Sequence, residues 1–188
     1  TAPEYAEMLA KHSITQAVQG EASAAALAAE AQRAGVEIDV HIKLDTGMGR
    51  TGIYAQGEQA ALAAAKEIER IYRLQGIHVK GLFTHFAAAD TPGEDTYTNW
   101  QLNNYNTVLN ALAAKGLRPE ICHASNSAAI MAHPGAHLDM VREGIMLYGL
   151  YPDSAPQPGG PLRPVLTLKS RVAQVRELPY HGSRAGTI

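Results

Sequence analysis

The sequence predicts an α/β fold in which helices cover a parallel sheet, followed by the start of a second, β-rich domain. Strand-like and helix-like segments alternate about five times with short connections. A proline- and glycine-rich stretch, YPDSAPQPGGPLRP, then separates this part from another alternating segment. We therefore divide the chain into a (β/α) domain over 1–150, a linker over 151–164 and the beginning of a C-terminal β domain over 165–188.

The strands are predicted from apolar residues at every second position, and the helices from strong helix formers followed by glycine or proline. The predicted strands are 14–18, 36–45, 78–87, 120–125, 138–150 and 165–178. The predicted helices are 21–34, 58–73, a segment around 100–116, and 125–133. At ~35 residues per strand-helix unit, a closed barrel of eight units needs ~250 residues. The chain therefore holds about five units, too few to close a sheet.

The composition excludes several function classes. Lys plus Arg number 16 against 18 Asp plus Glu, and the formal net charge of -2 leaves no basic surplus for a nucleic-acid backbone. No apolar run reaches the ~20 residues that cross a bilayer, and the first residues lack a signal-peptide pattern. We therefore expect a cytoplasmic protein without a nucleic-acid or membrane partner. The single cysteine, Cys122, can form no internal disulfide, and no Cys/His cluster has zinc spacing.

Polar side chains occur on four consecutive core strands, near the carboxyl ends where parallel sheets build their sites. These residues are His41, Lys43, Asp45, His85, His123 and Arg142. Each one alone could be a solvated edge charge, a hydrogen-bonded core histidine or a member of a structural ion pair. Their joint occurrence indicates a polar site, because buried charges need partners or a ligand.

Three loops add possible ligand contacts. The stretch DTGMGRTG at 45–52 carries three glycines after a strand, which allows the backbone to approach a ligand closely. Ser125-Asn126-Ser127 leads into a helix, and Glu143-Gly144-Ile145 brings free amides to a strand end. An ordinary strand-to-helix turn and a helix N-cap are the simpler interpretations of the first two. Together the loops favour a ligand that carries a phosphate.

Four stretches resemble, in order and spacing, the alanine racemase family: HIKLDTGMGRTGI (41–53), GLFTHFAAAD (81–90), HASNSAAIM (123–131) and MVREGIMLYGLYP (140–152). The similarity extends over most of the chain. It implies a (β/α)8 barrel of the TIM type, here partial and made of the later strands, followed by a β-rich domain. It also implies pyridoxal 5'-phosphate (PLP) as cofactor, an amino acid as substrate, interconversion of L- and D-alanine for peptidoglycan precursors, and a homodimer.

The resemblance assigns roles around the cofactor ring. Arg142 would face the pyridine nitrogen, which would stay unprotonated because a guanidinium does not readily release a proton. His123 would support Arg142 from behind, and His85 would pack against the ring. Arg50 would contact the phenolic oxygen and help position the substrate carboxylate. Lys43 matches a lysine that is often carbamylated in the family, and such a carbamate could pair with Arg50.

The resemblance also assigns the phosphate end of the cofactor. Ser127 and the amides of Gly144 and Ile145 would hold the phosphate, and Asn126 would orient Arg50. The catalytic residues implied in this chain are therefore Arg50, Arg142 and His85, and no metal site is implied.

Two features of the family have no match in the sequence. The lysine that holds the cofactor covalently belongs to a segment that would precede Thr1, and the catalytic tyrosine follows a GTI stretch like that of 186–188. In addition, VRELP runs directly into YHGSRAGTI, where the family has a longer stretch. We therefore expect a fragment of a racemase that is inactive on its own.

Three other functions remain open. One is a PLP-dependent racemase that prefers another amino acid, such as serine. Another is a metal-dependent hydrolase barrel, in which two metal ions would be held by a Lys43 carbamate, His41, His85 and His123. Arg50 and Arg142 argue against this second function, because they would place positive charge beside the cations. The third is a non-catalytic PLP-carrying barrel, against which the strand predicted after Pro164 argues.

Overall fold

The computed structural model describes residues 1–152 and 161–177. The strands are β1 (Gln16–Val18), β2 (Ile38–Asp45), β3 (Ile53–Tyr54), β4 (Ile77–Phe83) and β5 (Ile121–His123). The α-helices are α1 (Ala6–Lys11), α2 (Glu21–Ala34), α3 (Glu58–Ile71), α4 (Asp95–Ala113) and α5 (Ser127–Ala132). Short 3-10 helices are η1 (Pro3–Tyr5), η2 (Pro134–Ala136) and η3 (Ile145–Tyr148). The predictions for α2, α3, α5 and the first four strands are confirmed within a few residues, whereas α1 and β3 were not predicted.

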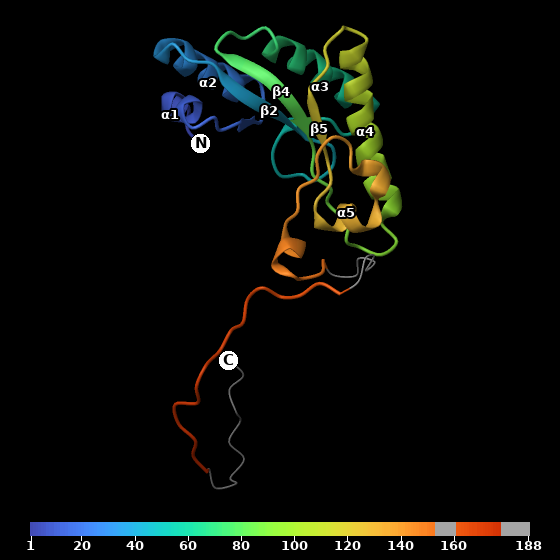
Figure 1. Cartoon of the computed structure of the whole chain (residues 1–188). Coiled ribbons are helices and arrows are strands. Elements are labelled where there is room, and N and C mark those ends of the chain that lie inside the picture. Colours follow the sequence, from blue (N-terminus) through green and yellow to red (C-terminus); the bar gives the residue numbers. More distant parts are fainter. Residues whose placement is uncertain (153–160, 178–188) are drawn as a thin grey trace.

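The strands of the sheet are parallel and follow chain order. The strand order is β1-β2-β4-β5, in which each strand pairs with the next. The short β3 pairs with β2 and is not part of this order. A doubly wound sheet reverses its strand order at a switch point, whereas a barrel adds its strands in sequence. Helices α2, α3 and α4 flank the sheet (Figure 1). The described residues therefore form part of a (β/α) barrel.

The two faces of β2 differ in chemistry, as the alternating pattern predicts. One face is apolar and at most 1% exposed, and it packs in the main core with α2, α3 and α4: Ile38, Val40, Ile42 and Leu44. Burying each of these side chains contributes about 1.5–3 kcal/mol. The opposite face belongs to the barrel interior and carries Asp39, His41, Lys43 and Asp45. The core thus fixes which side chains point toward the site.

A register shift interrupts the pairing of β2 with β4. Val40 lies opposite Val79, but the next residue of β2, His41, lies opposite Gly81, so Lys80 has no counterpart. A Cβ atom on Gly81 would come within 2.6 Å of the His41 ring. Lys80 instead reaches Asp39, with 2.8 Å between Nζ and Oδ2. The absence of a side chain at Gly81 therefore leaves room for the His41 ring inside the barrel.

The predicted strand over 138–150 is wrong in its extent. Its first part does run parallel to β5, because the Asp139 amide donates to the Cys122 carbonyl (3.0 Å) and Met140 forms an isolated bridge with His123. The backbone then leaves the extended conformation at Gly144 (φ -116°, ψ -106°) and enters η3. The amide of Met146, within η3, donates to a side-chain oxygen of α5. A single 3-10 helix, η3, therefore replaces the expected end of the strand.

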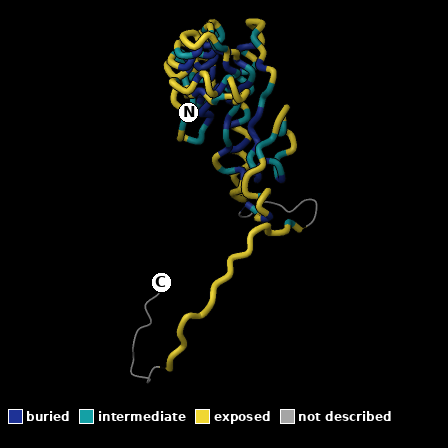
Figure 2. Tube along the Cα trace, turned by 60° about the vertical axis from the view of Figure 1, so that its left-hand side comes forward, coloured by how far each residue is buried: buried dark blue, intermediate teal, exposed yellow. Residues whose placement is uncertain are grey.

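The strand predicted at 165–178 is not formed in the residues that the structure describes. Residues 161–177 contain neither helix nor strand and are almost all exposed (Figure 2). A half-covered strand needs a sheet partner. Here the Val165 amide donates to the Tyr148 carbonyl (3.2 Å) and the Leu162 amide to the Tyr151 hydroxyl (2.6 Å), and these bonds form no ladder. Residues 153–160 of the predicted linker and 178–188 lie outside the described residues. The division into a barrel domain, a linker and a β domain stays a prediction.

No helix among the described residues is both long and apolar enough to span a bilayer.

Candidate functional site

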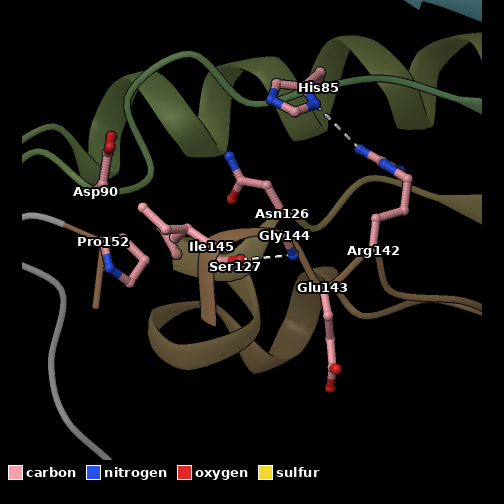
Figure 3. A pocket seen from close by; sticks show the side chains of 10 residues that line it. His85, Asp90, Asn126, Ser127, Arg142, Glu143, Gly144, Ile145 and Pro152 are labelled. Atoms are coloured by element: carbon pink, nitrogen blue, oxygen red, sulfur yellow. Dashed lines mark hydrogen bonds between the residues drawn. The ribbon is translucent and has the colours of Figure 1, made fainter. Parts of the chain in front are cut away.

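A cavity of about 320 Å³ opens beside the carboxyl ends of β4 and β5. It is lined by His85, Asp90, Asn126, Ser127, Ala128, Arg142, Glu143, Gly144, Ile145 and Pro152. Figure 3 shows side chains from the loop after β4, from α5 and from the segment after Met140 around one space, with the Glu143 side chain directed away from the others. All the predicted cofactor-binding residues except His123 therefore line a single cavity. Arg50 and Lys43 do not line it.

Arg142 is held by three hydrogen bonds to the ends of neighbouring strands. Its Nη2 donates to the carbonyls of Thr84 and Ala124, both at 2.9 Å, and its Nη1 lies 2.6 Å from Nδ1 of His123. The guanidinium also lies over the Phe83 ring, 5.5 Å from its centre. Burial lowers the pKa of Arg142, but an arginine still remains charged near neutral pH. These three contacts therefore hold a positively charged side chain in one position.

The contact with Arg142 determines the tautomers of two histidines. Because a guanidinium can only donate, Nδ1 of His123 must accept, so the His123 ring is neutral and protonated on Nε2. That nitrogen lies 2.8 Å from Nδ1 of His41 and donates to it. Burial, followed by the charges of Arg142 and His41, lowers the pKa of His123 to about 3. His123 also stacks on Phe83 with 4.8 Å between ring centres. His123 thus contacts Arg142 directly, and its supporting role toward a cofactor stays a prediction.

His85 follows β4 and presents its ring to the cavity (Figure 3). Its Nδ1 lies 3.5 Å from Nη2 of Arg142, which is long for a hydrogen bond. Burial, together with the positive charges of Arg142, Arg50 and Lys43, lowers the pKa of His85 to about 4. At neutral pH the ring is therefore uncharged, and it can pack against a flat ligand.

Ser127 connects α5 to the segment before η3. Its Oγ accepts from the amide of Gly144 at 2.9 Å and from that of Met146 at 3.4 Å. The Gly144 amide, which the resemblance assigned to the phosphate, thus already has an acceptor. The Ser127 hydroxyl proton and the Ile145 amide have no acceptor among the described residues, so both remain available to an anion.

Asn126 is the N-cap of α5, since its Oδ1 accepts from the Ala129 amide at 3.0 Å. This confirms the simpler interpretation of the Ser-Asn-Ser stretch. Arg50 is exposed, and the structure shows no hydrogen bond between it and Asn126. The expected orientation of Arg50 by Asn126 is therefore not formed in this arrangement.

Lys43 lies at the carboxyl end of β2 and is 8% exposed. Its Nζ donates to the Thr51 hydroxyl at 2.5 Å. Burial is the largest cause of its lowered pKa, and the charge of Arg50 comes next. Asp45 fixes the following loop by accepting from the amides of Gly47 (3.1 Å) and Gly49 (2.9 Å). The glycine-rich stretch is thus folded back over β2, beside Lys43.

Sequence reasoning missed several polar residues around the site. Asp90 lines the cavity, and buried residues beneath the loops are Thr46, Thr84, Gln101 and Asn104. Gln101 and Asn104 share the buried face of α4 with Tyr105, Val108 and Leu112. Amides at the spacing of a buried helix face were the available signal, because such groups must be hydrogen-bonded.

The contacts do not favour the metal-dependent hydrolase. Both ring nitrogens of His123 already have partners, Arg142 and His41. Within residues 1–152 and 161–177 the structure places no three His, Cys, Asp or Glu side chains so that they could share a metal ion.

Comparisons with known proteins match the whole (β/α) part of the chain. The family profile described as "Alanine racemase, N-terminal domain" matches residues 1–152. The alanine racemase of Desulfovibrio desulfuricans is 41% identical over 180 residues, which is 95% of this chain and 46% of that protein. The chain therefore spans about half the length of the curated relatives it matches.

Two solved structures share the fold. The alanine racemase of Clostridium difficile 630 in complex with cycloserine aligns with a TM-score of 0.78 at 39% identity, over 87% of this chain and 44% of that chain. A histidine racemase from Leuconostoc mesenteroides aligns with a TM-score of 0.71 at 28% identity, over 87% of this chain and 42% of that chain. The strand order and the profile match agree, and the chain belongs to the alanine racemase N-terminal domain family.

Proposed function

We propose that this chain is part of a PLP-dependent alanine racemase, an isomerase that interconverts L- and D-alanine for peptidoglycan precursors. The observation that carries the proposal is the convergence of His85, Ser127, Arg142 and Ile145 on one cavity. A neutral flat ring, a fixed cation and free anion-binding donors are what a phosphorylated pyridine ring requires. We further propose that the complete protein is a cytoplasmic homodimer, as the resemblance implies.

The donors of Arg142 fit the ring end of the cofactor. With Nη2 used by two carbonyls and Nη1 bonded once to His123, one Nη1 hydrogen and the Nε hydrogen remain for a pyridine nitrogen. The neutral ring of His85 would lie against the pyridine face. When bound, PLP supplies an electron sink for the charge left on the substrate α-carbon after proton removal. Because Arg142 keeps its proton, it would moderate that sink.

The phosphate end fits the segment from Ser127 to Ile145. The Ser127 hydroxyl, itself fixed by the amides of Gly144 and Met146, would donate its proton to a phosphate oxygen. The Ile145 amide supplies a second donor next to it. Both groups are set in place before the ligand arrives, which reduces the entropy lost on binding.

Arg50 and Lys43 would serve the substrate end of the site. We propose that Arg50 positions the substrate carboxylate and that Lys43 is carbamylated. The lowered pKa of Lys43 favours this modification, because only a neutral amine attacks carbon dioxide, and it loses a proton as the N–C bond forms. The resulting negative charge would then attract the Arg50 guanidinium.

The two groups that would move the α-proton, a lysine on one face of the substrate and a tyrosine on the other, have no counterpart among residues 1–188. We therefore expect racemisation by the complete protein and none by the 188-residue chain alone. The test measures the D-alanine that the complete protein and the 188-residue chain each form from L-alanine. The absorbance of bound PLP and the metal content are measured on the same samples. A complete protein that binds metal ions but no PLP would refute the proposal.

The histidine racemase among the structural neighbours makes substrate choice part of the test. L-serine and L-histidine are therefore assayed beside L-alanine. We expect the highest kcat/KM with alanine. A complete protein that binds PLP but turns over only serine or histidine would contradict the assignment of substrate and leave the cofactor site supported.

A further inference from the structure

Gln101 lies in the middle of α4 and is completely buried, with 0% of its surface exposed. It bonds to the segment after β4 at two points. Its Nε2 donates to the carbonyl of His85 at 3.1 Å, and its Oε1 accepts from the amide of Ala87 at 2.9 Å. One side chain is thus hydrogen-bonded to the backbone on both sides of Phe86, a residue that is 1% exposed.

The same amide reaches the loop after β2. Nε2 of Gln101 lies 3.5 Å from Oγ1 of Thr46, which lies 2.7 Å from Oγ1 of Thr84. The Thr84 hydroxyl in turn donates to the Leu44 carbonyl at 3.2 Å. All donors are consistent with one direction, from Gln101 through Thr46 and Thr84 to the end of β2.

The orientation of the Gln101 amide has only one solution. Turned over, its oxygen would face the His85 carbonyl and its NH2 group would face the Ala87 N–H, so neither hydrogen bond would remain. A buried polar group without a partner is strongly disfavoured. The amide therefore fixes the distance between α4 and the two chain segments.

Two neighbouring residues of α4 strengthen the hold on the loop after β2. The Tyr97 hydroxyl donates to the Gly47 carbonyl at 2.7 Å, and Nδ2 of Asn104 donates to the Thr46 carbonyl at 3.3 Å. This loop continues to Arg50 and Thr51. Of these three side chains of α4, Gln101 is the one that bonds both to this loop and to the segment that carries His85.

We propose that Gln101 is a positioning residue that holds the His85 backbone and the start of the loop after β2, at Thr46, in a fixed relation, so that His85 faces the cavity. The consequence for catalysis rests on the proposed racemase function. The effect on the His85 ring does not, because it follows from the hydrogen bonds alone.

Gln101→Met and Gln101→Glu in the complete PLP-loaded protein test the proposal. Methionine keeps the volume and removes all three bonds, whereas ionised glutamate keeps an acceptor for the Ala87 amide and has no donor for the His85 carbonyl. We expect kcat per bound cofactor to fall by about 10- to 100-fold, with a smaller change in KM. The control is Gln32→Met on α2, which removes an exposed side-chain bond to the Gln75 carbonyl.

NMR of the histidine rings in the PLP-free complete protein gives a readout other than activity. In the Gln101 variants we expect the His85 resonances to shift and broaden, while those of His78, at the opposite end of β4, stay unchanged. If Gln101→Met does not fold, Gln101→Glu decides. Wild-type-like kcat and His85 resonances in a folded variant would overturn the inference.

The two proposals fail in different ways. An inactive wild-type protein whose His85 resonances still respond to Gln101 would refute the racemase function and retain the positioning role. An active wild-type protein with variants equal to Gln32→Met would refute the positioning role alone.

Discussion

Arg142 sets the protonation state of the residues behind it. Because its Nη1 can only donate, Nδ1 of His123 must accept. Nε2 of His123 therefore carries the proton and donates to Nδ1 of His41. A protonated His123 would turn a donor toward Arg142 and bring two positive charges together. The site therefore depends on a histidine that stays neutral well below the pH at which free histidine becomes charged.

This dependence predicts a loss of stability in mild acid. The pKa of His123 is about 3 in the folded chain against about 6.5 in the unfolded chain, so the unfolded state binds more protons between these values. The contribution of His123 to the free energy of unfolding is thus fully present above about pH 6.5. It falls as the pH drops toward 3, and the loss is on the order of 3 kcal/mol at pH 4. Urea unfolding of the complete protein at several pH values measures the slope.

His123→Asn should reduce that slope, because the asparagine oxygen can accept from Arg142 without titrating, while His85, whose pKa is also lowered, keeps the remainder. The matched control is His12→Asn, at an exposed position after α1. Equal slopes for wild type, His123→Asn and His12→Asn would show that His123 makes no contribution.

At the level of single residues, the sequence predicted which residues lie at the site better than it predicted their hydrogen-bond partners. His85, Arg142 and Ser127 lie at strand or helix ends and carry chemistry that a core does not need, so their types were informative. The link from Ser127 Oγ to the Gly144 amide and the exposed position of Arg50 depend on loop conformations. Such conformations have no periodic signal in the chain.

Among the elements, β4 shows why alternation alone was an incomplete guide. Strict alternation would place Val79 and Leu82 on opposite faces, yet both are buried. The register shift at Lys80 restores the match by placing one extra residue in β4. Gly81 directly follows this irregularity, and only glycine leaves space for the His41 ring at that position.

Gly81→Ala therefore tests the packing between β4 and β2. The added methyl would lie 2.6 Å from His41 ring atoms and force the ring away from His123. We expect a destabilisation of about 1–3 kcal/mol, measured by urea unfolding of the complete protein. Gly135→Ala is the control, because a Cβ atom there would meet nothing within 4 Å, and it should change stability by less than about 0.5 kcal/mol. Equal effects of the two substitutions would contradict the steric argument.

The helix α4 shows a second limit of periodicity. Of its aromatic and aliphatic residues, Tyr105 and Val108 are buried while Trp100 is 36% exposed. The helix packs partly on polar backbone at the strand ends. Gln101 and Asn104 therefore take positions that an apolar stripe would assign to larger hydrophobic residues.

For the molecule as a whole, the described sheet has an unpaired outer edge. β1 pairs only with β2 in the described sheet, and its free side offers backbone groups to another chain. The sequence predicted this openness from the number of strand-helix units. It could not predict how the segment 161–177 lies, because that segment has few contacts to define it.

The open edge predicts self-association of the 188-residue chain. We expect its mass in light scattering to rise above 20.1 kDa at about 10–100 μM. Ala17→Lys, on the exposed side of β1, should reduce this rise, because a charge on an edge strand opposes pairing. Ala29→Lys, at an exposed position on α2, is the control because it adds the same charge away from the edge. A rise that both substitutions reduce equally would point to net charge as the cause.

The extra residue in β4 also determines where the barrel tolerates a change in length. Removing one residue from a regular strand inverts every side chain that follows it, from interior to exterior. Removing Lys80 would instead give a regular ladder in which Leu82 still faces the helices and Phe83 still faces His123. Only the ion pair with Asp39 would be lost. A deletion at this single point would therefore spare the geometry around Arg142.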